Sequence, residues 1–276
     1  MQIANRNKKI QFELYLIKKT RELFGFKKMI KFMIGLSTVI FTKRNRSAYE
    51  IMGPCKMNIN NQSVVWKHPD TGFIDELIFE KCYFPNDEYD IQDDYIVIDA
   101  GSNIGVFSIY SACYCSNGRV IAIEADKYDY KRLVENIEAN SFSNIETLNM
   151  ALTEKTGEVF FSDCSVQDVD VSDNAKQNYF FEGKCQSITL GDVIKKFDLK
   201  KIDFLKLDIE GSEFKIFDDA KWLDIVKIIS MEVHAEPDDP QTLKIKEILE
   251  QNNFLVQIIK NGGTVYCYAK KHQLAK

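Results

Sequence analysis

The sequence is poor in the residues that mark non-globular chains, with only 13 glycines and 5 prolines among 276 residues. This scarcity excludes a collagen-like repeat and a low-complexity linker, and 45% hydrophobic with 12% aromatic residues excludes a disordered chain. No run reaches about 18 uninterrupted apolar residues, so we expect no helix that spans a bilayer. The length suits one large α/β domain with an extension.

Two further absences concern the compartment. No apolar stretch directly follows residues 1–9, MQIANRNKK, so we expect no secretory signal. No CxxC pair occurs among the seven cysteines, which are Cys55, Cys82, Cys113, Cys115, Cys164, Cys185 and Cys267. We expect buried, reduced thiols. The sequence therefore predicts a reducing, cytoplasmic setting.

Acidic residues are scarce in one part of the chain. Residues 1–46 hold twelve Lys or Arg and only two acids, Glu13 and Glu22, which gives this segment a net charge of +10. The remainder carries −15, within a total of −5. An acidic body binds nucleic acid poorly, so we expect no nucleic-acid partner. We interpret residues 1–46 as a basic, partly amphipathic arm.

The apolar residues of the arm have helical spacing over 10–34, and residues 32–41 are almost wholly apolar between Lys31 and Lys43. A run of about ten residues is too short to span a membrane but can lie in its interface. Three partners stay open for the arm: the body or a partner protein, an anionic lipid surface, or nucleic acid. A lipid contact would place the protein peripherally at the membrane.

Residues 47–90 are interpreted as a small N-terminal subdomain with a strand at 63–67 and a helix at 73–83. From residue 95 strands alternate with helices: strands at 95–101, 119–125, 145–152, 202–210 and 226–235, and helices at 102–116, 127–141 and 238–252. A shorter strand at 157–162 and a hairpin of 254–260 with 264–270 complete the pattern. Residues 91–276 are thus predicted to form a Rossmann-like, mostly parallel sheet of the methyltransferase kind.

A glycine-containing turn, Asp99-Ala-Gly-Ser-Asn-Ile-Gly105, ends the first of these strands. It lacks the G-x-G-x-x-G spacing of dinucleotide sites and the lysine of a P-loop, which disfavours NAD. An acid before the turn suits a cationic amino-acid end, as in S-adenosylmethionine. Glu124 ends the next strand 25 residues later, where a carboxylate can accept hydrogen bonds from both ribose hydroxyls. The alternative for the glycine motif is a plain strand-to-helix turn.

Charged residues also end the two strands that follow. Lys206, Asp208 and Glu210 share one side of strand 202–210, and His234 ends strand 226–235. Buried charges are costly unless paired or used, so the Lys206–Asp208 pair is either structural or part of a ligand site. Asp208, Glu210 and His234 are expected to converge above the sheet. His234 is then a general base for a hydroxyl, a divalent-metal ligand with the two carboxylates, or a structural residue.

These motifs resemble those of the FkbM family of S-adenosylmethionine-dependent methyltransferases. The matching pieces are IDAGSNIGVFS at 98–108, IEAD at 123–126, the spacing of Leu133, Asn136 and Asn140, NMAL at 149–152, KLDIEGSE at 206–213 and MEVH at 231–234. KLDIEGSE is the most specific of them. The sequence departs mildly from the family at Ser102, where Ala is usual, and at Ala125, where Pro is usual.

The resemblance implies a class I methyltransferase fold, with seven strands in the order 3-2-1-4-5-7-6 and strand 7 antiparallel. It implies O-methylation, typically of a sugar, glycan or natural-product hydroxyl. It also implies a cofactor site: Asp99, Gly101, Asn103 and Gly105 for the methionine part, Glu124 for the ribose, Met150 and Ala151 for the adenine, and Asp208 between cofactor and acceptor. Ser102 and Ala125 belong to the same motifs and are predicted to line this site.

In the resulting hypothesis, the enzyme aligns an acceptor hydroxyl with the sulfonium methyl group. His234 or Asp208, with Glu210 beside them, takes the proton of that hydroxyl. Residues 163–186 form a long segment, polar and then aromatic. We expect either a lid over the acceptor, with Tyr179 and Phe180 stacking on a sugar, or a solvated insertion.

Three competing functions remain open. The first is a catalytically idle methyltransferase-like module docked at a membrane or partner by the basic arm. The second is an NAD-dependent oxidoreductase, which the glycine spacing disfavours. The third is a nucleic-acid methyltransferase, which the acidic body and the absence of an Asn-Pro-Pro-Tyr motif disfavour. The acceptor and the oligomeric state have no signature in the sequence.

Overall fold

The computed structural model describes residues 2–42, 52–162, 165–168 and 183–272. The chain forms two compact units, Met1–Lys81 with Val134–Ser141, and Cys82–Leu133 with Phe142–Lys276. Across the described ranges, no helix is both long and apolar enough to cross a membrane.

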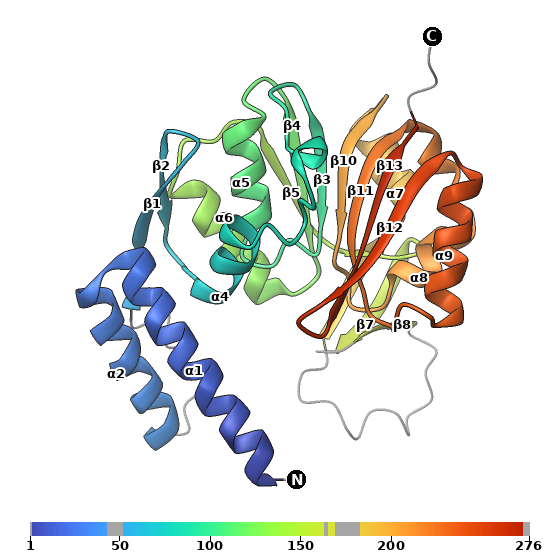
Figure 1. Ribbon diagram of the computed structural model, residues 1–276. Helices are drawn as coiled ribbons and strands as arrows, with labels where there is room; N and C mark the ends of the chain where they lie inside the picture. The colour runs from blue at the N-terminus through green and yellow to red at the C-terminus, as the bar shows by residue number, and fades with distance from the viewer. Residues whose placement is uncertain (1, 43–51, 163–164, 169–182, 273–276) are drawn as a thin grey trace. The chain divides into compact units, whose positions relative to one another are not determined.

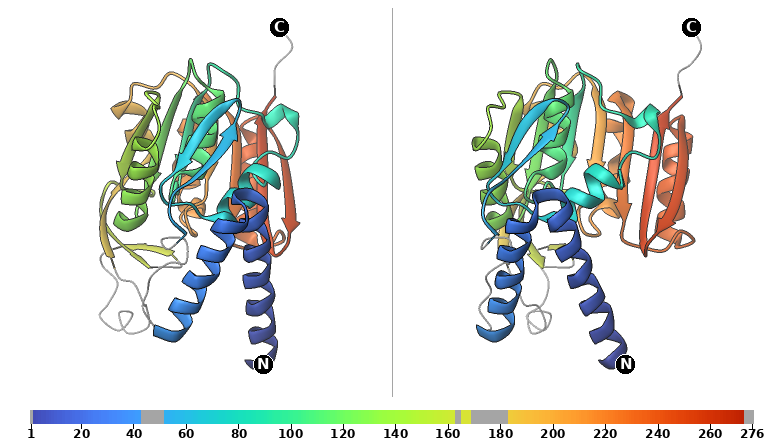
Figure 2. Two further views of the ribbon diagram at one scale, coloured as in Figure 1. Left: turned by 90° about the vertical axis from the view of Figure 1, so that its left-hand side faces the viewer. Right: turned by 60° about the vertical axis from the view of Figure 1, so that its left-hand side comes forward.

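The first unit begins with a helical hairpin, α1 (Gln2–Phe24) and α2 (Phe26–Thr42), whose helices lie side by side in Figures 1 and 2. Gly25 separates them at φ 83°, a left-handed conformation that glycine adopts without strain. Leu16 of α1 and Phe32 of α2 are buried in one hydrophobic cluster with Met52 and Cys55. The helical spacing predicted for this segment is confirmed, with a break at Gly25.

A short hairpin and two short helical segments follow in the first unit. The hairpin joins β1 (Cys55–Ile59) to β2 (Gln62–Trp66), which confirms the strand predicted at 63–67. The helical segments are α4 (Thr71–Ile74) and the π-helical η1 (Asp75–Phe79). The predicted helix at 73–83 is therefore wrong at both ends.

Local chemistry explains those two bounds. The Asp70 carboxylate accepts hydrogen bonds from the backbone amides of Gly72 and Phe73 and so begins the helix early. Lys81 at φ 51° lies in the left-handed region and prevents continuation to residue 83. Helix α1 is tied to this segment by Lys19, whose ammonium lies 2.9 Å from the buried Asp75 carboxylate.

The two asparagines of the L-x-x-N-x-x-x-N spacing hydrogen-bond to the backbone of the first unit. Asn140 accepts from the Val65 amide at 2.8 Å and donates to the Val65 carbonyl at 2.9 Å. Asn136, on α6 (Lys127–Glu138), binds the backbone of His68 in the same way, at 2.8 and 3.2 Å. Each asparagine thus replaces a missing strand partner for the segment that contains β2. Hydrogen bonding to the backbone thus explains the two asparagines of this motif.

The second unit contains a seven-stranded sheet in the order β12-β13-β11-β10-β3-β4-β5 (Figure 1). Its strands are β3 (Ile96–Ala100), β4 (Arg119–Glu124), β5 (Ile145–Asn149), β10 (Ile202–Leu207), β11 (Val226–Val233), β12 (Phe254–Asn261) and β13 (Thr264–Lys271). Only β13 runs antiparallel to its neighbours β11 and β12. Numbered along the chain, the order is 3-2-1-4-5-7-6 with strand 7 reversed, so the predicted fold class is confirmed.

Helices cover both faces of this sheet. Adjacent residues of a strand point to opposite faces, and in β10 these are Phe204 and Leu205. The Phe204 ring lies 5.6 Å from that of Phe107 on α5 (Val106–Tyr114). Leu205 belongs instead to the buried cluster that contains Val193 of α7 (Leu190–Lys196) and Leu249 of α9 (Pro240–Gln251). The remaining short segments are η2 (Asp87–Tyr89), α8 (Glu213–Ile216), η4 (Phe217–Asp219) and η5 (Lys221–Ile225).

Several helices and strands were predicted too long, and residues with left-handed backbone conformation account for two of these errors. The strand predicted at 202–210 ends at Leu207, because Glu210 and Gly211 have φ of 53° and 92°. The helix predicted at 102–116 begins only at Val106, because Gly105 at φ 89° precedes it. Periodicity alone detects the apolar run but not these conformational stops.

A second sheet of four strands, in the order β6-β9-β7-β8, occupies part of the predicted insertion. Its strands are β6 (Ala151–Leu152), β7 (Gly157–Ser162), β8 (Ser165–Asp168) and β9 (Gly183–Ile188). No strand was predicted within 163–186, and the structure places β8 and the start of β9 there. Tyr179 and Phe180, expected to stack on a sugar if the segment is a lid, lie outside the described residues.

Candidate active site

The turn after β3 is held against the end of β10. Gly101 has φ 75°, and a Cβ there would lie 1.7 Å from the carbonyl oxygen of Asp208. A Cβ on Gly105 would lie 2.5 Å from Leu133. Gly101 therefore requires glycine for backbone packing as well as for conformation, whereas at Gly105 the close atom is a side-chain methyl of Leu133 and the left-handed φ of 89° is the main requirement. This packing sets the 101–105 turn directly beside the backbone of Asp208.

A buried ion-pair network underlies the turn. Asp99 is fully buried, accepts from the Ser108 hydroxyl at 2.5 Å, and lies 3.3 Å from the Lys206 ammonium. Lys206 also lies 3.6 Å from Asp208 and donates to the Gly101 carbonyl at 2.7 Å. Burial lowers the pKa of Lys206, but Asp99 and Asp208 outweigh it, so the net pKa is raised and the ammonium stays charged.

This network changes the interpretation of two sequence features. The predicted Lys206–Asp208 pair is present, but Asp99 is the nearer partner of Lys206 and was not foreseen in that role. The Asp99 carboxylate already has its own cation and a hydroxyl donor. Its contact with the methionine part of a cofactor stays a prediction.

Glu124, at the end of β4, closes the same turn from the other side. Its two carboxylate oxygens accept from the backbone amides of Asn103 and Asp126, each at 2.7 Å. Burial raises the pKa of Glu124 to about 7, although these two amides act to lower it. Each carboxylate oxygen has a second acceptor position, so the group can still receive two ribose hydroxyls. The Ser102 hydroxyl donates to the Asp99 carbonyl at 2.7 Å, so its hydrogen bond is made within the turn.

The residues predicted to flank adenine lie where β5 ends. Met150 is partly buried against the main core, and Ala151 is buried at the start of β6. Asn149 donates to the carbonyl oxygens of Glu124 at 2.8 Å and Ala125 at 3.1 Å, which joins the ends of β4 and β5. Sequence reasoning assigned Asn149 no role, although it begins the quoted motif NMAL. Adenine contacts of Met150 and Ala151 stay predictions, as does the place of Ala125 in the lining of the cofactor site.

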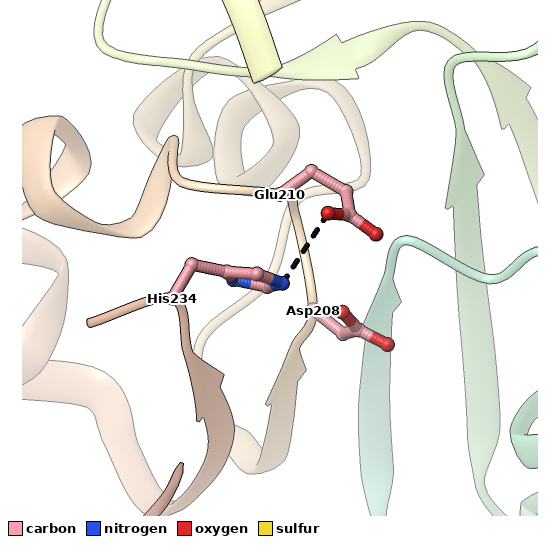
Figure 3. Close-up of side chains that lie close together, drawn as sticks. All are labelled: Asp208, Glu210 and His234. Atoms are coloured by element: carbon pink, nitrogen blue, oxygen red, sulfur yellow. Dashed lines mark ion pairs between the residues drawn. The ribbon is translucent and has the colours of Figure 1, made fainter. Parts of the chain in front are cut away.

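The structure brings together the three side chains predicted to converge, Asp208, Glu210 and His234 (Figure 3). Each offers one ligand atom, and these atoms all lie within 4.8 Å of one another. Nε2 of His234 lies 3.3 Å from Glu210 and 3.9 Å from Glu232. Asp208 accepts from the hydroxyl of the buried Tyr83 at 3.0 Å, which holds its carboxylate beside the cluster.

Glu213, the first residue of α8, is a neighbour of His234 that sequence reasoning missed. It is fully buried, and one of its carboxylate oxygens lies 2.9 Å from both the backbone nitrogen and Nδ1 of His234. Its other oxygen accepts from the Gly211 amide at 2.9 Å. The proton on Nδ1 is therefore held by Glu213, and Nε2 is left to face the cluster. The available signal was the final acid of KLDIEGSE, to which no role was given.

The surroundings of His234 favour its charged form. The hydrogen bond with Glu213 raises its pKa to about 9, burial opposes the rise, and the charges of Glu213, Glu210 and Glu232 add to it. Burial also raises the pKa of Glu210, against the lowering effect of His234.

Two kinds of chemistry fit this cluster. An imidazole with its Nδ1–H held by a carboxylate can accept a proton at Nε2. The same arrangement orients a histidine toward a metal, and two carboxylates with one imidazole suit a divalent ion.

Comparison with known families identifies the family of the chain. Residues 99–258 match the model of the methyltransferase FkbM domain. The chain belongs to this family. The predicted family resemblance is thereby confirmed, and the matched range begins at Asp99 and includes Glu124, Asp208, Glu213 and His234.

Curated relatives are methyltransferases and a synthetase. "Methyltransferase 1" of Beauveria bassiana is 26% identical over 233 residues, which cover 74% of this chain and 90% of that protein. "Methyltransferase sdnD" of Sordaria araneosa is 24% identical over 212 residues, 65% of this chain and 80% of that protein. The AMB antimetabolite synthetase AmbE of Pseudomonas aeruginosa is 25% identical over 248 residues, 72% of this chain but 12% of the synthetase.

Solved structures with a similar chain path are also methyltransferases. The precorrin-6y C5,15-methyltransferase of Geobacter metallireducens has a TM-score of 0.41 and 16% identity, covering 66% of this chain and 82% of that one. A SAM-dependent methyltransferase of Aquifex aeolicus has a TM-score of 0.38 and 14% identity, with 73% and 98% covered. The fold assignment rests on the strand order of the sheet.

Proposed function

We propose that this FkbM-family chain is an S-adenosylmethionine-dependent O-methyltransferase that acts on a hydroxyl of a sugar, glycan or related natural product. The observation that carries the proposal is the charge of the residues gathered at the carboxyl ends of β3, β10 and β11. Five carboxylates and two cations form one connected network: Asp99, Asp208, Glu210, Glu213 and Glu232, with Lys206 and His234. Three negative charges are therefore in excess.

That excess selects between cofactor classes. S-adenosylmethionine carries a sulfonium, an ammonium and one carboxylate group, so its net charge is positive and a negative site attracts it. A nicotinamide dinucleotide carries an anionic pyrophosphate, which the same site repels, and the 101–105 turn lacks its glycine spacing. The charge and the turn thus support the same choice by independent routes.

The donor set of the site fits the cofactor. Glu124 keeps two acceptor positions suited to a ribose diol, and Asp208 presents a partly exposed carboxylate beside the 101–105 turn. The residues that would hold the cofactor are Asp99, Gly101, Ser102, Asn103 and Gly105, then Glu124, Ala125, Met150 and Ala151, with Asp208 toward the acceptor. When bound, S-adenosylmethionine supplies an electrophilic methyl group.

His234 is the proposed general base. Nε2 takes the proton of the acceptor hydroxyl, while Glu213 holds Nδ1–H and stabilises the imidazolium that forms. Asp208, fixed by Tyr83 and Lys206, would position the hydroxyl, with Glu210 next to it. Orientation of the hydroxyl supplies most of the rate gain, as in other two-substrate transfers.

The raised pKa of His234 sets a condition on this mechanism. With a pKa of about 9, His234 is largely protonated at neutral pH in the protein without ligand. A cationic ligand nearby disfavours the imidazolium and lowers that pKa toward the working range. Binding of a cation and activation of the base are therefore coupled in this site.

Calorimetric titration of the full chain tests the cofactor assignment. S-adenosylmethionine and S-adenosylhomocysteine should bind with dissociation constants of about 1–100 μM, whereas NAD should not bind. Glu124→Ala should abolish binding, and Glu247→Ala, an exposed acid of α9, should leave it unchanged. If folded protein binds neither sulfur compound, the enzyme proposal fails and the idle docking module takes its place.

A further inference from the structure

One face of α2, its inner face, packs against other residues of the first unit. Phe32 is buried with Leu16, Met52 and Cys55, and Leu36, one turn later, packs against the same cluster. Lys28, one turn earlier, donates to the carbonyl oxygens of Met52 at 3.1 Å and Gly53 at 3.3 Å. Residues 28, 32 and 36 therefore mark the face by which α2 is held.

The opposite face of α2 is apolar as well. Phe26, Ile30, Met33 and Ile34 have exposed fractions of 62%, 39%, 42% and 53%. At 3.6 residues per turn these four positions lie together on the side away from Phe32. The outer face of a surface helix ordinarily carries polar residues, so folding of the first unit does not account for this stripe.

The charges around this stripe have one sign. Lys27 and Lys31 follow Phe26 and Ile30 by one position, are exposed, and border the stripe along one edge. Helix α2 contains no Asp or Glu, and residues 1–46 carry a net charge of +10. An apolar stripe bordered by lysines is the pattern of a helix that lies flat in a membrane interface.

We propose that the outer face of α2 docks this protein on an anionic lipid surface. The stripe of Phe26, Ile30, Met33 and Ile34 enters the boundary between headgroups and acyl chains, and the ammonium groups of Lys27 and Lys31 reach lipid phosphates. The helix lies parallel to the surface. This proposal is independent of the methyl-transfer proposal, because it uses none of the residues of the second unit.

Charge and polarity favour lipid over a second copy of the chain and over nucleic acid. In a symmetric contact between two copies, α2 would place Lys27 and Lys31 near their own counterparts without an acid on the helix to pair with them. Nucleic acid is contacted mainly through polar and cationic side chains, whereas the centre of this face is apolar. Anionic lipid satisfies the apolar stripe and its cationic border together.

Vesicle co-sedimentation of the full chain tests the proposal. Vesicles of phosphatidylcholine alone are compared with vesicles containing about 30 mol% phosphatidylglycerol, at low and high ionic strength. The double variant Ile30→Asp/Met33→Asp removes the stripe at exposed positions, and Lys27→Glu/Lys31→Glu reverses its border. Leu243→Asp, on an exposed leucine of α9 in the second unit, is the matched control. Circular dichroism confirms that each variant is folded.

The expected result is binding to the anionic vesicles that weakens at high ionic strength and persists in Leu243→Asp. Each double variant should lower the partition coefficient more than tenfold. The absence of binding to anionic vesicles, or equal binding to neutral ones, would overturn the proposal. So would unchanged binding by both double variants. If the chain is a dimer that Ile30→Asp/Met33→Asp converts to a monomer without any vesicle binding, a second copy is the occupant and the lipid proposal is wrong.

Discussion

One oxygen of the Glu213 carboxylate lies 2.9 Å from both the backbone nitrogen and the ring Nδ1 of His234. Glu213 is fully buried, and its second oxygen is occupied by the Gly211 amide, so the carboxylate cannot turn away from the ring. The ring orientation of His234 and the position of its proton are thus set by a residue 21 positions away in the chain. Glu213 is a positioning residue in the proposed mechanism, and His234 is the catalytic one.

The pH dependence of the reaction should reveal this pair. The base form of His234 is required, and its pKa of about 9 in the ligand-free protein is lowered by a bound cationic cofactor, so kcat/KM for the acceptor should rise with pH and level off below pH 9. In Glu213→Gln the neutral side chain no longer supports the imidazolium, so the rise should move to lower pH. NMR titration of the His234 ring should show the same downward shift without an acceptor. An unmoved ring pKa in folded Glu213→Gln would remove Glu213 from this role.

Replacement of His234 should separate catalysis from cofactor binding. In His234→Ala we expect kcat to fall by about 10²–10⁴, the usual contribution of a positioned acid or base, while S-adenosylmethionine binds no more weakly than to the parent chain, because a nearby positive charge is removed. His272→Ala, at an exposed histidine near the end of β13, is the control and should behave as the parent chain. Full activity in His234→Ala would show that another group takes the proton.

A chelator distinguishes the two chemistries that fit Asp208, Glu210 and His234. With His234 as a general base, dialysis against EDTA should leave kcat unchanged, and added magnesium or manganese should not raise it. Loss of activity on dialysis, restored by a divalent ion, would assign the same three side chains as metal ligands instead. Calorimetry with the ion alone gives a readout that does not depend on turnover.

The packing of the glycine turn predicts that Gly101→Ala destabilises the protein more than Gly262→Ala does. Gly262 and Gly101 both have left-handed φ, at 60° and 75°, but a Cβ at Gly262 meets nothing within 4 Å. Gly262→Ala should therefore cost about 1 kcal/mol, the strain of that conformation alone. Gly101→Ala adds an overlap with the Asp208 carbonyl and should cost about 3 kcal/mol or more, with loss of cofactor binding. Equal free energies of unfolding in urea would show that the turn is not packed as described.

The buried network should depend on Lys206. In Lys206→Met the ammonium is removed while Asp99 stays buried without a cation, which should lower the free energy of unfolding by about 3–5 kcal/mol. Lys200→Met breaks an exposed pair with Asp198 and should change it little. In Lys206→Met/Asp99→Asn the orphaned charge is gone, so part of the loss should return. A double variant as unstable as Lys206→Met would mean that Asp99 is not the charge that Lys206 compensates.

Sequence patterns were sufficient for the centre of the main sheet because β3, β4 and β10 are short buried apolar runs with an acid at or directly after their ends. Ile96–Ala100 and Ile202–Leu207 are fully or almost fully buried along their length, so composition and period identify them without tertiary information. The closing hairpin around Asn261-Gly-Gly263 has an equally local signal. Local signals failed at 163–186, where β8 and β9 form through antiparallel pairing with β7.

What the sequence determined by itself is the alternation of strands and helices, the sheet type and the positions at which acids and glycines end the strands. Each of these follows from residues close together in the chain. Only the tertiary structure decided which polar groups are partners: Lys206 with Asp99, His234 with Glu213, and Asn136 with the backbone of His68. Those pairings join residues on different elements, and the strength of a buried charge or hydrogen bond depends on what folding places next to it.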